Sequence, residues 1–101
     1  MKKIVVTVPV ADADKLREAI GQAGGGKIGK YSFCSFSSRG IGRFKPEEGA
    51  HPAIGDIGKL EEAEEERIEI TCGGDFVIPV IAAIKRAHPY EEPVIDIYSL
   101  D

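Results

Sequence analysis

The sequence predicts an α+β fold, a ferredoxin-like two-layer sandwich of βαββαβ order with an additional hairpin. Segments with the two-residue alternation of strands and segments with helical periodicity follow one another as strand, helix, strands, helix, strand. The length of 101 residues suits a single domain, residues 1–101, with one hydrophobic core. The composition, 43% hydrophobic and 30% charged, is ordinary for a soluble globular protein.

The first strand and helix are the clearest elements. In "KIVVTVPV", residues 3–10, apolar side chains alternate, so that Ile4, Val6 and Val8 share one face with Val10. Residues 11–26 follow with a helical stripe of apolar residues, and acidic residues stand near the start of this helix, where the dipole is positive. Three glycines, residues 24–26, predict its end.

The middle of the chain predicts the remaining strands. Residues 31–46, "YSFCSFSSRGIGRFKP", carry aromatic residues around a Ser-Ser-Arg-Gly turn, which predicts a hairpin. Residues 47–62 show no regular periodicity, and "RIEITC", residues 67–72, predicts a strand with Cys72 facing the core. We also expect Cys34 to point into the core from a strand, as a second buried thiol.

The last helix and strand enclose a proline-rich connection. Residues 76–88 have helical periodicity, and Pro79 is compatible with a helix only in its first turn. Pro89 disfavours helical geometry at His88, so the helix should end there. Residues 93–100 predict the final strand. Both helices would then cover one face of the sheet, and we expect the other face to be covered by oligomerisation.

Several functional classes are not expected. The glycines of "GGGKIG" match a dinucleotide motif in letters, but they follow a helix and precede a strand, the reverse of what phosphate binding requires. A net charge of −4 gives no reason to expect a nucleic acid partner. No apolar run is long enough for a membrane span, and no signal peptide is recognisable. Two distant cysteines are typical of a cytoplasmic protein with reduced thiols.

Two charged segments allow two interpretations each. "SRGIGRFKP" places Arg39, Arg43 and Lys45 around two glycines, which could hold an anion or form a solvated basic strand edge. "KLEEAEEER" could bind a hard cation, or could be a solvated acidic approach to the next strand. Its carboxylates could also pair with basic residues of a neighbouring subunit.

The segment "AHPYEEP", residues 87–93, also has two interpretations. Its prolines favour a stiff connection between helix and strand, with His88 in a structural role. Alternatively, His88 could converge with Glu91 or Glu92 on a metal ion or a proton. The residues alone leave both interpretations open.

Ordered motifs across nearly the whole chain, "GKIGKYSFCSF", "GIGRFKP", "HPAIG", "EEERIE" and "AHPYEEP", resemble the inserted domain of the Nif-three-like family. Members of this family are also labelled GTP cyclohydrolase I type 2 homologues. The family's dinuclear metal site lies in flanking segments that have no counterpart in this sequence, so its suggested hydrolase activity is not implied here. Lys30 and His51 stand where asparagines are usual in the family.

The same domain is similar to the CutA and PII group, whose members form trimers. The "H-x-Y-E-x-P" pattern of CutA-type proteins matches His88, Tyr90, Glu91 and Pro93. The resemblance implies a CutA/PII-like fold and a homotrimer, with this connection near subunit contacts.

We therefore predict a non-catalytic trimeric binding or regulatory module, free-standing, with ligands at subunit clefts lined by residues 39–56 and 88–92. No catalytic residue is predicted. The candidate ligand-binding residues are His51, Arg43, Tyr90 and Glu92, and the candidate ligands of a divalent copper or zinc ion are His88 and Glu91. The alternatives are an accessory subunit of a metal-dependent hydrolase whose core domain is encoded separately, and a purely structural trimer.

Overall fold

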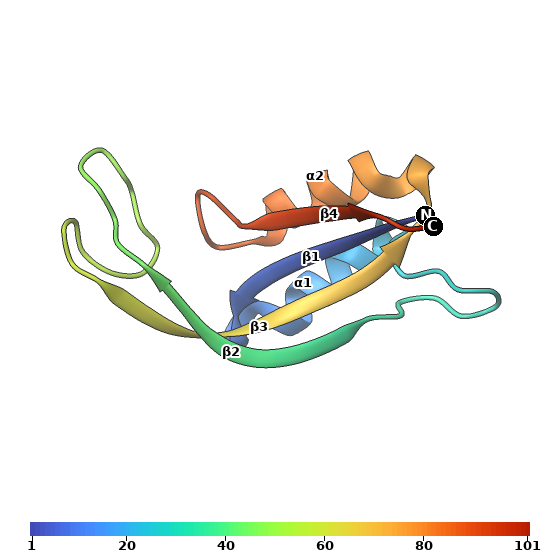
Figure 1. The fold of residues 1–101 in the computed structure, drawn as a ribbon, viewed down its shortest axis with the longest axis horizontal. Helices are drawn as coiled ribbons and strands as arrows, with labels where there is room; N and C mark the ends of the chain where they lie inside the picture. The colour runs from blue at the N-terminus through green and yellow to red at the C-terminus, as the bar shows by residue number, and fades with distance from the viewer.

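A computed structural model describes residues 1–101 and confirms the predicted fold class. The elements are β1 (Lys2–Pro9), α1 (Ala13–Gln22), β2 (Phe36–Phe44), β3 (Glu61–Cys72), α2 (Val77–Ala87) and β4 (Ile95–Ser99). The strands form one antiparallel sheet in the order β2-β3-β1-β4. Both helices lie against the same face of this sheet, and the two termini lie side by side (Figure 1).

The core lies between the sheet and the helices, where the alternation of the strands predicted it. Its fully buried side chains come from alternate positions of β1 and β3 and from the inner faces of both helices: Ile4, Val6, Val8, Ile68, Cys72, Leu16, Ile20, Val80 and Ile84. Each such aliphatic side chain contributes about 1.5–3 kcal/mol through removal from water. Val10 lies in a short 3₁₀ turn before α1 and is only partly buried.

The hairpin predicted within residues 31–46 is wrong, because this segment contains the single strand β2. The predicted turn residues Ser37 and Gly40 lie within β2 and pair with Ile68 and Glu65 of β3. The hairpin is instead β2 with β3, connected by residues 45–60. Residues 61–64 of β3 pair only with β2, beyond the end of β1. Residues 41–64 therefore project from the domain as an arm (Figure 1).

The acidic segment is part of β3 and is not a solvated approach to it. Arg39 and Arg43 of β2 stand opposite Glu66 and Glu62 in the ladder, and opposite charges facing each other stabilise strand pairing. Glu65 and Glu66 are only 7% and 9% exposed. Glu62 and Glu64 remain exposed, as their charge predicted, whereas the buried Glu65 and Glu66 contact Tyr90 and Arg17.

The two cysteines differ from each other. Cys72 is buried in the core as predicted, and burial raises the pKa of its thiol. Cys34 lies in the loop before β2 and is only half-buried, so the prediction that it points into the core from a strand is wrong.

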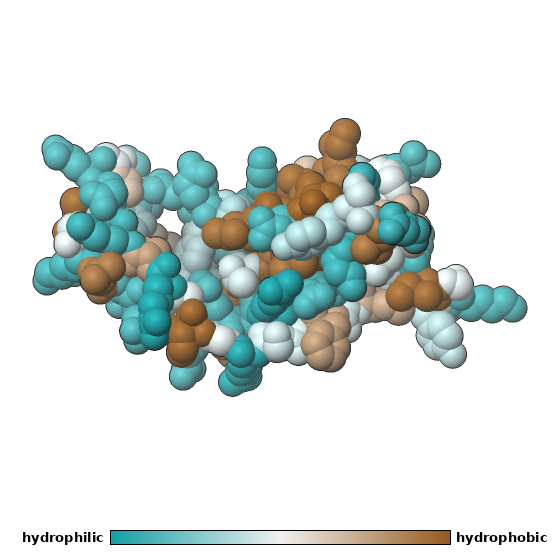
Figure 2. Space-filling model, viewed as in Figure 1, coloured by the Kyte–Doolittle hydropathy of each residue, from teal (hydrophilic) through white to brown (hydrophobic).

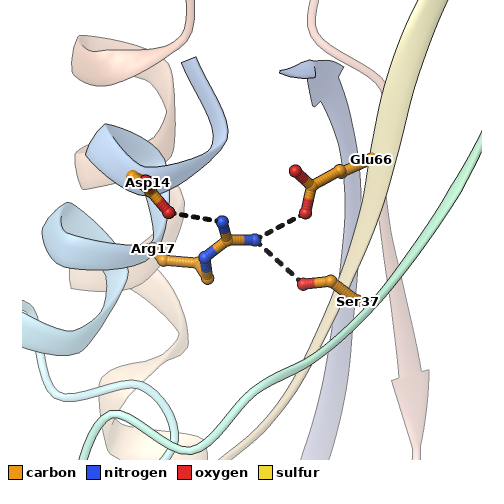
Figure 3. A network of polar contacts seen from close by, with 4 residues as sticks. All are labelled: Asp14, Arg17, Ser37 and Glu66. Atoms are coloured by element: carbon orange, nitrogen blue, oxygen red, sulfur yellow. Dashed lines mark hydrogen bonds and ion pairs between the residues drawn. The ribbon is translucent and has the colours of Figure 1, made fainter. Parts of the chain in front are cut away.

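A polar network joins α1 to the sheet. Arg17 of α1 donates to Asp14 Oδ1 at 2.6 Å, to Glu66 Oε1 at 2.8 Å and to Ser37 Oγ at 3.0 Å (Figure 3). Hydrogen bonds to Asp14 and to Glu66 raise the pKa of Arg17, so its positive charge is secure. The negative charge of the buried Glu66 carboxylate is thereby balanced by the positive charge of Arg17.

The surface carries scattered apolar groups. Phe36 on the sheet face away from the helices and Tyr98 of β4 are exposed, as is Ile78 on α2. Figure 2 shows single hydrophobic residues among hydrophilic ones, a group of hydrophobic residues where α2 and β4 lie, and a hollow between the arm and the rest of the domain. Neither helix has the length and apolar character needed to cross a membrane.

Candidate functional site

An open cavity of about 530 Å³ lies between the arm and the connection from α2 to β4. We call this connection, residues 88–94, the joint. Phe44 and Ile54 of the arm and Tyr90 and Val94 of the joint give the cavity apolar walls. Gly40, Gly42 and Glu65 line it where the arm meets the sheet. An apolar concavity with a few polar groups is the usual form of a small-molecule site.

His88 fixes the start of the joint. The helix α2 ends at Ala87, and His88 is extended, with φ −75° and ψ 135°, as the following proline predicted. Its buried ring lies between two backbone groups: Nε2 donates to Thr7 O at 2.7 Å, and Nδ1 accepts the Tyr90 N–H at 3.1 Å. These contacts require the neutral tautomer that carries its proton on Nε2. These contacts match the interpretation in which His88 has a structural role in the connection between helix and strand.

Tyr90 crosses from the joint to the arm and the sheet. Its ring centroid is 5.9 Å from that of Phe44 and 5.0 Å from that of His88, and its hydroxyl donates to Glu65 Oε2 at 2.8 Å. Burial of the phenol, together with its hydrogen bond to Glu65, raises the pKa of Tyr90 above its ordinary value. The phenol therefore stays protonated at neutral pH and remains a donor to the carboxylate.

Most of the predicted site residues gather at this cavity, within one chain. Arg43, Tyr90, Glu91 and Glu92 line it. His51 is exposed, and its backbone N–H donates to Glu91 Oε1 at 2.9 Å, which ties the loop of the arm to the joint. The sequence placed these residues at clefts between subunits, whereas a single chain already brings them together.

The predicted metal ligands, His88 and Glu91, already make hydrogen bonds within the chain. Both ring nitrogens of His88 are occupied by backbone groups, and Glu91 is held by the His51 N–H. Nowhere in residues 1–101 do three or more His, Cys, Asp or Glu side chains gather as a metal site would require. The copper or zinc site at His88 and Glu91 stays a prediction.

Sequence reasoning missed Glu65, whereas Gly40, Gly42 and Phe44 lie within the predicted segment 39–56. Alternation from Arg67 places Glu65 on the sheet face opposite the core, where a carboxylate is expected to be solvated. Its burial depends on Tyr90, which reaches it from 25 residues away. No pattern in the sequence around Glu65 predicts its contact with Tyr90. In the sequence the glycine pair of "GIG" suggested an anion site, and in the structure the Glu65 carboxylate lies over Gly42.

The residues that form this cavity belong to a segment found in longer bacterial proteins. The chain is 51% identical over 98 residues to the GTP cyclohydrolase 1 type 2 homolog of Halalkalibacterium halodurans, covering 97% of the chain and 26% of that protein. It is 46% identical over 101 residues to the Bacillus subtilis protein of the same name, covering 100% of the chain and 27% of that protein. The chain is related to one segment of the GTP cyclohydrolase 1 type 2 homologs. It spans about a quarter of their length.

Solved structures agree with this relationship. A Bacillus cereus protein related to NIF3 superposes with a TM-score of 0.86 at 49% identity, over 99% of this chain and 25% of that chain. The CutA protein of Archaeoglobus fulgidus superposes with a TM-score of 0.71 at 19% identity, over 100% of this chain and 85% of that chain. The second likeness shows a CutA-like fold for this chain. No family model matches the chain.

Proposed function

We propose that this chain is a non-catalytic binding module that takes a small organic molecule in the cavity between the arm and the joint. The observation that carries the proposal is the cavity itself, open to solvent, about 530 Å³ in volume and walled by Phe44, Ile54 and Tyr90. Its size falls within the range of small-molecule sites, its apolar walls are combined with charged side chains, and Glu91, Tyr90 and Glu65 are held by hydrogen bonds. A regulatory role would follow if the ligand changed how the arm or the joint meets a partner.

Filling the cavity from within tests this function. Gly40 lines the cavity, and a Cβ atom there would meet no other atom within 4 Å, so the Cβ of Gly40→Leu would not clash and the larger side chain would occupy space at the cavity. We expect small aromatic probes, followed by the ¹H–¹⁵N spectrum, to shift the amides of Gly42, Tyr90 and Glu92 in the wild type. The Gly40→Leu variant should weaken this binding by about 10-fold or more, because the probe loses its space.

The matched control is Gly40→Ala, whose single methyl group leaves most of the cavity free. Probes that shift amides elsewhere on the domain, or that bind equally to the wild type and to Gly40→Leu, would contradict a function at this cavity.

We further propose that the module is a homotrimer. The uncovered sheet face with Phe36 and Tyr98 exposed supports self-association, and a CutA-like fold is compatible with it. Sedimentation equilibrium at micromolar concentration should give three times the chain mass of 10.9 kDa. A stable monomer at that concentration would exclude the trimer.

A second candidate function is supported by the relatives. Because the chain matches a quarter of proteins such as that of Bacillus subtilis, the module could serve a metal-dependent hydrolase whose metal-binding core is a separate part. This candidate function predicts a binding partner similar in sequence to the part of the Bacillus subtilis protein that this chain does not match. The purified chain should form a defined complex with that partner. Gel filtration of an equimolar mixture that gives two separate peaks would count against it.

A further inference from the structure

Glu65 is a buried carboxylate without a cationic partner. It is 7% exposed, and its neighbours in the sheet, Pro9 and Gly40, carry no charge. No nitrogen of a lysine, arginine or histidine lies within 4.0 Å of its oxygens, and its one side-chain hydrogen bond comes from Tyr90. The adjacent Glu66 is similarly buried but has Arg17 at 2.8 Å. Because buried charges are normally paired, Glu65 is the exception that needs an explanation.

The free side of this carboxylate lies at the cavity. Oε2 accepts the Tyr90 hydroxyl, whereas Oε1 makes no hydrogen bond within the chain. A Cβ atom at Gly42 would overlap Oε1, so the carboxylate lies directly over the backbone of this glycine. Gly42 and Glu65 both line the cavity. No buried side-chain oxygen of the chain lacks a hydrogen-bond partner, so the unpartnered Oε1 keeps contact with solvent, and a ligand in the cavity can reach it.

The cations that line the cavity do not meet this need. Arg43 pairs with Glu62 at 3.1 Å, Lys45 with Glu47 at 3.8 Å and Arg67 with Glu69 at 3.3 Å, and none of these three carboxylates lines the cavity. Arg39 also lines the cavity and makes no ion pair, but it is not within 4.0 Å of Glu65. Glu91 and Glu92 add two more carboxylates to the cavity lining. Four basic side chains line the cavity, yet none lies within 4.0 Å of the Glu65 carboxylate, which is left without a positively charged N–H donor.

We propose that the ligand of this cavity is a small organic cation, in which an ammonium, guanidinium or amidinium group pairs with Glu65 Oε1. This inference rests on the proposed function and specifies the ligand class of that site. A planar amidinium or guanidinium presents two N–H groups that suit a carboxylate, and the rings of Tyr90 and Phe44 offer apolar contact to the ligand body. The same positive group could also come from a basic side chain of a second copy of this chain, and the experiment separates the two sources.

Four probes of similar size test the ligand class: benzamidine, benzylamine, benzoate and benzyl alcohol. Titrations of the full chain, followed by ¹H–¹⁵N spectra, should show benzamidine and benzylamine binding at least about 10-fold more tightly than the other two. Glu65→Gln keeps the side-chain volume and removes the charge, so it should weaken benzamidine binding at least about 10-fold. Glu64→Gln is the matched control, because Glu64 is an exposed neighbour in β3 that does not line the cavity.

A second variant guards against a folding defect in Glu65→Gln. Gly42→Ala keeps Glu65 but displaces its carboxylate, so it should weaken benzamidine binding while leaving benzyl alcohol binding within about threefold. Circular dichroism confirms the fold of each variant.

The outcomes separate this inference from the proposed function. Benzoate or benzyl alcohol binding in the cavity as tightly as benzamidine, or an unchanged affinity in Glu65→Gln, would overturn the cationic ligand and leave the cavity function intact. No shift of cavity amides with any of the four probes would overturn both. If no probe binds and Glu65→Gln also loses self-association, the cation is a side chain of a second copy, and the small-molecule proposal fails.

Discussion

Gly26→Ala is expected to lower the free energy of unfolding by about 2–5 kcal/mol, from backbone strain and overpacking together. Gly26 has φ +79°, in the left-handed region, and a Cβ atom there would overlap the carbonyl oxygen of Cys34. The backbone cannot easily move away, because Gly26 N–H donates to Thr71 O at 3.0 Å and Gly26 O accepts Cys34 N–H at 2.9 Å. These contacts tie the loop after α1 to the end of β3.

Gly29→Ala is the matched control for this substitution. Gly29 also has a positive φ, +55°, but a Cβ atom there would meet nothing within 4 Å. It should cost only the backbone term, about 1 kcal/mol. Urea unfolding of both variants, with equal m-values, measures the difference. Equal losses of unfolding free energy in the two variants would mean that the overlap with the Cys34 carbonyl oxygen does not destabilise Gly26→Ala.

His88→Ala should lower the free energy of unfolding by about 2–4 kcal/mol, because it leaves two backbone groups at the start of the joint without partners. The Thr7 carbonyl loses its donor, and the Tyr90 N–H loses its acceptor. The joint should then loosen, which we expect to move the Tyr90 amide resonance and to weaken probe binding at the cavity.

The other histidine provides the control. The side chain of His51 is exposed, and only its backbone N–H makes a hydrogen bond. His51→Ala should therefore change stability by no more than about 0.5 kcal/mol. If the two histidine variants lose similar stability by urea unfolding, His88 does not hold the joint.

The sequence predicts most of the fold because strong local signals agree with the long-range pairing. The alternation around Ile4 and Ile68 and the position of Pro79 in the first turn of α2 all match the structure. The prediction fails at Ser37 to Gly40, where turn-forming composition suggested a local hairpin. Pairing of this segment with β3 over more than 20 residues of sequence overrides that preference.

The candidate site is predicted only in part, for a physical reason. The sequence identifies the joint and the arm as candidate site segments, but not the way in which they meet. Burial of Glu65 depends on Tyr90, and the role of His88 depends on the Thr7 carbonyl at 2.7 Å, 81 residues away. Contacts of this kind exist only after β1, the joint and the arm have folded together.

The most direct test of a binding function is a crystal structure of the chain with the tightest-binding of the four probes. We expect the probe in the cavity between the arm and the joint, with its ring against Phe44 and Tyr90 and, for benzamidine, a nitrogen about 3 Å from Glu65. A probe bound elsewhere, or a cavity filled by side chains of a second copy, would contradict a small-molecule function of this cavity.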